Sequence, residues 1–264
     1  MAKVVDVFEY LNELAPVSLK MDFDNVGLLV GDASENVAKC LIALDITDEV
    51  ITEAVQLGAQ LIVSHHPIIF GSVKSVTADD LVGRKIIALV RSNISAICMH
   101  TNLDIAEDGV NDALMAALSV KPQRWLEACG SDSSGNIVGC GRIGELDEPM
   151  EFVDFMRICK SALNAKGLRY HYAGKPVKKL AVMGGAGGSS LMEAVNAGCD
   201  TYVTSDIKYN AFLDAKELGI NLIDAEHFCT ENVIVPVLAD KLSAKFPDVE
   251  VFISSVHKQT TQFF

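Results

Sequence analysis

Apolar and polar positions follow two alternating patterns along the chain. Short apolar runs typical of buried strands, such as Cys40 to Leu44, Leu61 to Val63 and Ala96 to Met99, are separated by longer segments with the periodicity of amphipathic helices, at 48–57 and 81–90. This alternation predicts an α/β fold in which helices flank mixed, mostly parallel sheets.

The pattern changes between residues 127 and 148, where glycines and serines interrupt short β-prone pieces. Such a segment predicts either a hairpin or a domain boundary. Beyond it the alternation resumes, with apolar runs at Leu180 to Met183, Thr201 to Val203 and Ile220 to Ile223. We therefore expect the second half of the chain to repeat the construction of the first.

One stretch makes this repeat specific. Residues 53–66 align without gaps on residues 193–206, and five of the 14 positions are identical. A helix, a glycine that stops it and a strand coincide in the two stretches. Chance similarity between two helix-to-strand units is the alternative. If the match is real, the chain holds two related α/β halves, and Asp206 occupies the position that His66 has in the first half.

Composition narrows the class of protein. With 264 residues, half of them apolar, the chain can bury a large core. Its net charge of −13 argues against nucleic acid as a partner, because phosphate binding needs clustered Lys and Arg. The seven cysteines show no C-x-x-C pair, as in reduced cytoplasmic proteins, and no run of 18 apolar residues predicts a membrane span.

Three polar clusters stand out against the apolar runs. They are Ser64-His65-His66-Pro67, His100-Thr101-Asn102-Leu103-Asp104, and His227-Phe228-Cys229-Thr230-Glu231. Open α/β sheets bind ligands at the carboxyl ends of their strands, where His65, His66, Asp104 and Asp206 are expected. Histidines and carboxylates without paired thiolates favour a divalent ion such as zinc, iron or manganese over a structural zinc–cysteine site.

Spacing limits how these residues can act. Neighbouring strand residues point to opposite faces, so His65 and His66 reach one ion only if the strand has ended, as Pro67 suggests. Alternatively each histidine binds a different ion of a two-metal site, with the ions about 3.5–4 Å apart and Asp104 bridging them. His227 and Glu231, four residues apart, share one face of a helix expected from Phe228 to Val237.

Other residues are weaker candidates. His100 either binds the metal or orients a ligand through a hydrogen bond. Cys229 lies off the helical face of His227, and His171 and His257 are expected to be structural. The glycine-rich segment 184–190 predicts either an anion-binding helix start or a tight turn that needs small residues.

Taken together, several motifs resemble the NIF3-like family, also labelled GTP cyclohydrolase 1 type 2 homologues. They are Asp24 to Gly31, Ser64 to Pro67, His100 to Asp104, the Gly184 to Gly188 loop, Thr204 to Tyr209 and Asp224 to Glu231. The resemblance covers nearly the whole chain in the right order. Two positions depart from the family pattern, since Ser205 and Glu226 stand where glycine is usual, which puts the local backbone conformation in question.

The resemblance implies two similar α/β domains, residues 1–125 with 232–264 and residues 126–231, and a dinuclear metal site in the cleft between them. Carried over by position, the ligands of its two divalent ions are His65, His66, Asp104, His227 and Glu231. It also implies a homohexameric ring.

Two functions fit these observations. The first is a metal-dependent hydrolase of a small nucleotide-like or phosphorylated substrate, with Glu231 or Asp206 as candidate proton acceptor. The alternative is a non-catalytic metal-binding ring that recruits a partner or regulates it.

Overall fold

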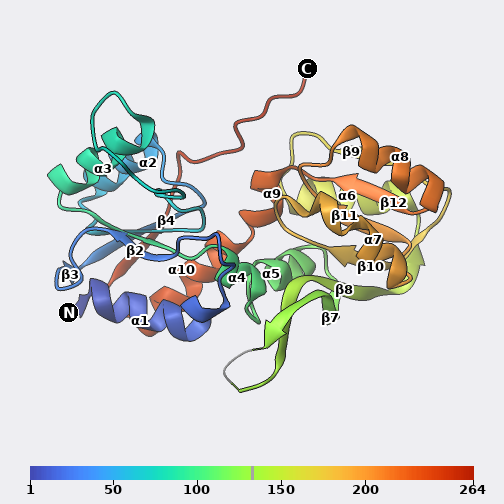
Figure 1. Ribbon diagram of the computed structural model, residues 1–264, viewed down its shortest axis with the longest axis horizontal. Coiled ribbons are helices and arrows are strands. Elements are labelled where there is room, and N and C mark those ends of the chain that lie inside the picture. Colours follow the sequence, from blue (N-terminus) through green and yellow to red (C-terminus); the bar gives the residue numbers. More distant parts are fainter. Residues whose placement is uncertain (132–133) are drawn as a thin grey trace. The chain divides into compact units, whose positions relative to one another are not determined.

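The apolar runs of the sequence form the strands of two α/β units in the computed structural model, which describes residues 1–131 and 134–264 (Figure 1). Unit 1 comprises residues 1–106 and 235–258, and unit 2 comprises residues 107–234 and 259–264. The sequence prediction placed the first division at residue 125. The division falls earlier because helix α5 (Val110–Ala117) packs against strands of unit 2.

Unit 1 is built on a five-stranded sheet of order β13-β4-β5-β6-β2. Its first four strands are parallel, and β2 runs antiparallel at one edge. The strands are β13 (Glu250–Ile253), β4 (Lys39–Ala43), β5 (Leu61–Ser64), β6 (Ser95–Cys98) and β2 (Gly27–Val30). The short strands β1 (Ala2–Lys3) and β3 (Asn36–Val37) pair with each other. The helices of this unit are α1 (Val4–Leu14), η1 (Val17–Leu19), α2 (Asp48–Leu57), α3 (Leu81–Arg91), α4 (Thr101–Ile105) and α10 (Ile234–Lys245).

Local sequence explains where α2 begins and ends. The Thr47 side chain accepts a hydrogen bond from the Val50 N–H at 3.2 Å, and acidic residues occupy the first turn. Gly58 ends the helix in the left-handed conformation, with φ 68°. The apolar face of α2 then packs on the inner residues of β4 and β5, such as Leu41 and Ile62, which are fully buried.

Unit 2 has a six-stranded mixed sheet of order β7-β8-β10-β11-β12-β9, in which β10, β11 and β12 are parallel. The strands are β7 (Lys121–Ser131), β8 (Ile137–Met150), β9 (Arg169–His171), β10 (Val177–Val182), β11 (Thr201–Thr204) and β12 (Asn221–Asp224). The helices besides α5 are α6 (Phe152–Ala162), η2 (Gly187–Ser190), α7 (Leu191–Asn196), α8 (Tyr209–Leu218) and α9 (His227–Glu231). The glycine- and serine-rich segment predicted to be a hairpin or a boundary is the hairpin of β7 and β8.

The predicted repeat is confirmed in detail. Gln60 Oε1 accepts the backbone N–H groups of residues 38–39 at 2.8 and 3.0 Å, at the start of β4. At positions 140 residues later, Asp200 Oδ2 accepts hydrogen bonds from the backbone N–H groups of residues 178–179 at 3.0 and 2.8 Å, near the start of β10. Each unit then places a five-residue helix after its third parallel strand, α4 after β6 and α9 after β12. The two units are therefore related, and equivalent helices carry Asp104 and Glu231.

One predicted element is wrong. The helix expected from Phe228 to Val237 is two helices, because α9 ends at Glu231 and α10 begins at Ile234. Pro236 has no N–H to donate to a preceding turn, so the chain starts a new helix in which this proline lies in the first turn.

Among the described residues, no helix is both long and apolar enough to cross a membrane.

Candidate metal centre

Three histidines gather in unit 1, at the carboxyl ends of two neighbouring parallel strands. His65 and His66 follow β5, and His100 follows β6. One ring nitrogen from each of the three lies within 4.8 Å of the others. The His65 ring is completely buried, whereas the side chains of His66 and His100 are 22% and 17% exposed. His65 and His66 lie at the carboxyl end of a parallel strand, as the sequence predicts, and His100 lies beside them.

His65 is held in a single tautomer. Its Nδ1 lies 2.8 Å from the carbonyl oxygen of Met99. A carbonyl only accepts, so Nδ1 carries the hydrogen and Nε2 carries the lone pair that a metal needs. The same Nε2 lies 3.6 Å from Asp104 Oδ1, which α4 supplies. His65 and Asp104 therefore present a nitrogen and an oxygen donor side by side.

His66 is oriented by a carboxylate that the sequence analysis did not identify. Its Nδ1 lies 2.7 Å from Asp45 Oδ1, and the other oxygen of Asp45 lies 2.9 Å from His257 Nε2. Burial raises the pKa of Asp45, but hydrogen bonds and charge interactions with the two histidines outweigh it and hold the pKa well below its usual range. His257, expected to be structural, thus helps to position Asp45. The sequence did hold a sign of this role for Asp45, because Asp45 follows the apolar run of β4 and so lies at a strand end.

His100 has the same arrangement, with its Nδ1 2.8 Å from Asp24 Oδ1. The Asp24 carboxylate also accepts the backbone N–H of Thr101 at 3.0 Å, which places it at the start of α4. Burial raises the pKa of Asp24, and these hydrogen bonds outweigh it and lower the pKa. The segment just before β2 thus supplies the carboxylate that orients His100. The distances are compatible with either role predicted for His100.

Unit 2 provides a second group of donors. His227 Nε2 lies 3.0 Å from Glu231 Oε2, one helical turn away in α9, and His227 Nδ1 lies 2.8 Å from Asp206 Oδ2. Burial lowers the pKa of His227, but Glu231 and Asp206 outweigh it and raise the pKa to about 9. Two carboxylates on one imidazole favour a positive charge there, whether a proton or a metal ion supplies it.

The glycine-rich loop is shaped by Glu231. Gly185 has φ +63°, and a Cβ at this position would lie 2.1 Å from Glu231 Oε1. The backbone N–H groups of Gly184 and Gly185 donate hydrogen bonds to Asn111 Oδ1 at 2.9 Å and to Thr230 Oγ1 at 3.0 Å, and not to an anion. Of the two interpretations of this segment, the structure therefore supports the tight turn that needs small residues.

The two departures from the family pattern have different consequences. Glu226 adopts φ 70° and ψ 138°, a conformation that favours glycine, directly before α9. Ser205 is not strained in this way, because the positive φ of 54° falls on the next residue, Asp206. The buried hydroxyl of Ser205 instead donates to the carbonyl of Gly185 and ties the loop to the end of β11.

The weaker candidates belong elsewhere. Cys229 is buried in the apolar core of unit 2, where burial raises its thiol pKa to about 11, so it faces away from the donors of α9. His171 ends the edge strand β9 and pairs in register with Leu222. Neither is among the groups of donor atoms that lie close enough together to share an ion, within the part of the chain that the structure describes.

Fold and donors together define a class: an α/β protein with two related units, each placing imidazole and carboxylate groups at the carboxyl ends of its parallel strands. A family model described as Duf34/NIF3 (NGG1p interacting factor 3) matches residues 2–260. The chain therefore belongs to the NIF3 family, as the sequence resemblance indicated.

Relatives and solved structures agree. A Clostridium perfringens protein named GTP cyclohydrolase 1 type 2 homolog is 37% identical over 99% of each chain, and a Streptomyces coelicolor protein of the same name is 34% identical over 88% of this chain and 82% of its own. The crystal structure of a Bacillus cereus protein related to NIF3 superposes with a TM-score of 0.93 at 25% identity, over 100% and 99% of the chains. A hypothetical protein of Staphylococcus aureus gives 0.91 at 30%, over 99% of each.

Proposed function

We propose that His65, His66, Asp104, His227 and Glu231 bind two divalent metal ions, and that the protein is a metal-dependent hydrolase of a small nucleotide-like or phosphorylated compound. One observation carries the proposal. His65, His66, His100 and His227 each pair Nδ1 with a backbone carbonyl or a carboxylate, which is the arrangement that orients metal-binding histidines through Nε2.

The donor set fits divalent transition metals. It consists of imidazole nitrogens and carboxylate oxygens, which suit zinc, iron or manganese, and the nearby Cys229 is directed into the core. Each carboxylate already lies beside the Nε2 of a histidine, at 3.6 Å for Asp104 and 3.0 Å for Glu231. Bound divalent ions would supply water activation at neutral pH and polarisation of a carbonyl or phosphoryl group.

Protein residues supply the remaining steps. Asp206 is the proton acceptor that we favour, because its carboxylate is 54% exposed beside His227 and accessible to substrate. Glu231, only 5% exposed, is better placed as a ligand. The two roles of Asp206 are compatible, since Oδ2 lies beside His227 and a carboxylate has a second oxygen that can accept a proton.

Exposed aromatic rings support a substrate with a planar ring. The Phe70 ring centroid lies 6.1 Å from that of His100 and 6.2 Å from that of Phe23. Phe23 and Phe70 are 64% and 54% exposed, which is unusual for phenylalanine and leaves both rings available for stacking on a nucleobase. The relatives named GTP cyclohydrolase 1 type 2 homolog agree with a nucleotide-like substrate class.

The test combines metal analysis with an activity screen. Protein purified from cytoplasm without chelator should contain two divalent ions per chain, and it should hydrolyse members of a panel of nucleotides and phosphoesters. His66→Ala and Asp104→Asn should abolish turnover, whereas His171→Ala, on β9, should not. Sedimentation of each variant should show the hexamer that we also propose.

The same variants separate the enzyme from the alternative. Loss of hydrolysis with an intact assembly supports the hydrolase. A protein that binds metal but turns over nothing in the panel, and whose variants lose only the binding of a partner, is the regulatory ring instead.

A further inference from the structure

Two cysteines face each other on the β7–β8 hairpin, with their Sγ atoms 3.2 Å apart. Cys129 comes from β7 and Cys140 from β8. We propose that this pair is a thiol–disulfide exchange site, which reacts with a low-molecular-weight disulfide and closes to a cross-strand disulfide. The proposal is independent of the metal centre, because neither thiol belongs to the donor set described above.

The strand pairing explains why the thiols meet. Ala128 pairs with Gly139 and Gly130 with Val138, so Cys129 is an extra residue between two ladder pairs. Such a bulge turns its side chain away from the regular alternation and re-aims it. Here it directs Cys129 diagonally across the ladder, toward Cys140 on the partner strand.

The backbone around both thiols can adjust. The sulfur atoms need to approach by about 1 Å to reach covalent distance. Gly130 follows Cys129 with φ +144°, and Cys140 lies between Gly139 and Gly141, the latter with φ +65°. Glycines at these positions allow small changes of φ and ψ that other residues resist.

The two thiols differ in a way that assigns their roles. Cys129 is exposed, and its hydrogen bond with Cys140 lowers its pKa to about 7 despite partial burial, which favours its reactive thiolate form. Cys140 is 7% exposed. Cys40 and Cys159, by contrast, are buried, and burial raises their pKa to about 12. Cys129 is therefore the attacking thiol and Cys140 the resolving one.

The reaction balances without any metal. The Cys129 thiolate attacks one sulfur of the small disulfide, the S–S bond of that disulfide breaks, and one small thiolate leaves and takes up a proton. Cys140, after losing its proton to solvent, attacks the mixed disulfide and releases the second small thiol. Two protein thiols are oxidised and one small disulfide is reduced to two thiols.

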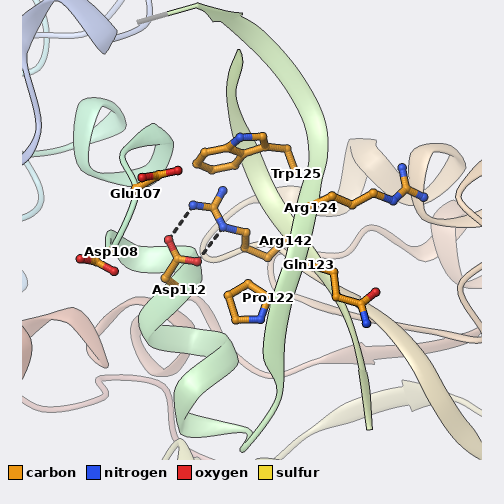
Figure 2. A pocket seen from close by; sticks show the side chains of 8 residues that line it. All are labelled: Glu107, Asp108, Asp112, Pro122, Gln123, Arg124, Trp125 and Arg142. Carbon is orange, nitrogen blue, oxygen red and sulfur yellow. Dashed lines mark hydrogen bonds and ion pairs between the residues drawn. The ribbon is translucent and has the colours of Figure 1, made fainter. Parts of the chain in front are cut away.

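The hairpin carries its own reporter. Trp125, the only tryptophan of the chain, lies four residues before Cys129, and its Nε1 donates to the carbonyl of Ile137 on β8 at 2.9 Å. Figure 2 shows the indole ring over the guanidinium of Arg142, which is paired with Asp112. A cavity of about 280 Å³ adjoins these groups. A change in the hairpin at Cys140, two residues from Arg142, should therefore alter tryptophan fluorescence.

The experiment uses the whole protein with oxidised and reduced glutathione as the probe. Trypsin releases both cysteines in the single peptide Trp125–Arg142, so the disulfide appears as a peptide lighter by two hydrogens that resists alkylation. We expect this peptide to dominate in oxidised glutathione and to disappear in reduced glutathione, in step with tryptophan fluorescence. The peptide that carries Cys159 should remain alkylatable throughout.

Variants assign the order of attack. Cys140→Ala should accumulate a glutathione adduct on Cys129, because the resolving thiol is missing, whereas Cys129→Ala should form neither the adduct nor the disulfide. Cys199→Ala is the matched control and should behave as the natural protein. Full alkylation of both thiols in the natural protein after oxidation, or an adduct that persists on Cys129 there, would overturn the proposal.

Discussion

Substitution of Gly185 by alanine tests whether the glycine-rich loop exists to make room for a metal ligand. A Cβ on this residue would lie 2.1 Å from Glu231 Oε1 and 3.3 Å from His227 Cε1. The backbone cannot easily move, since the Gly185 N–H is donated to Thr230 at 3.0 Å. The carboxylate of Glu231 must therefore leave its position beside His227.

Substitutions at two other glycines separate the effect of backbone strain from the effect of the clash with Glu231. Gly198 has φ +74°, and among the described residues only the end of the Lys179 side chain would lie within 4 Å of an added Cβ. Gly198→Ala should therefore lower the free energy of unfolding by the left-handed strain alone, about 1–2 kcal/mol. Gly185→Ala adds the clash with Glu231, for a total of about 2–5 kcal/mol. Gly188→Ala, whose Cβ would meet only ordinary contacts at 3.7 Å, should stay within about 0.5 kcal/mol.

The assay measures two quantities for each variant. Urea unfolding of the metal-free protein gives the stability loss, and titration with zinc against a competing chelator gives the metal affinity. We expect Gly185→Ala to weaken zinc binding by about 10- to 100-fold or more, as loss of ligand orientation does, and Gly198→Ala to leave it unchanged. If both variants bind zinc equally well, the carboxylate of Glu231 is not a ligand and the reasoning fails.

Three further outcomes follow from the same contacts. Asp45→Asn, which removes the charge beside His66, should weaken zinc binding by about tenfold in the same chelator titration, and unchanged affinity would deny Asp45 an orienting role. Glu226→Gly should raise the urea stability by about 1 kcal/mol, because relief of the positive φ exceeds the added entropy of the unfolded chain, and a loss of stability would show that the strain is absent. The rate of Cys129 alkylation by iodoacetamide should rise with pH through a midpoint of about 7, because the reactive thiolate forms there. Cys140→Ala removes the hydrogen bond and should move this midpoint toward 9. An unmoved midpoint would show that the hydrogen bond does not lower the pKa of Cys129.

The sequence predicted the candidate metal ligands better than the carboxylates that orient them. The histidines after β5 and β6 could be placed together because parallel strands end at the same edge of a sheet. Asp24 and Asp45 could not be assigned to them, since a hydrogen bond such as His100 to Asp24 joins residues 76 positions apart, and no local pattern encodes it. Strand-end position was the available signal for Asp45.

Local rules also competed with one another. The four-residue spacing of His227 and Glu231 correctly predicts a helical turn, but the helix expected through Val237 ends at Glu231, and Pro236 lies in the first turn of the next helix, α10. Glu226 shows the opposite case, because directly before α9 it adopts a positive-φ conformation that its side chain disfavours. Neither outcome follows from the propensity of a single segment.

The most direct test of the metal proposal is a crystal structure of protein purified without chelator and supplied with zinc, with anomalous diffraction recorded at the zinc edge. The proposal predicts two anomalous peaks per chain, with Nε2 of His65, His66 and His227 and the carboxylates of Asp104 and Glu231 at about 2.0–2.2 Å from them. Peaks bound by other residues, or these five side chains without any peak, would contradict it.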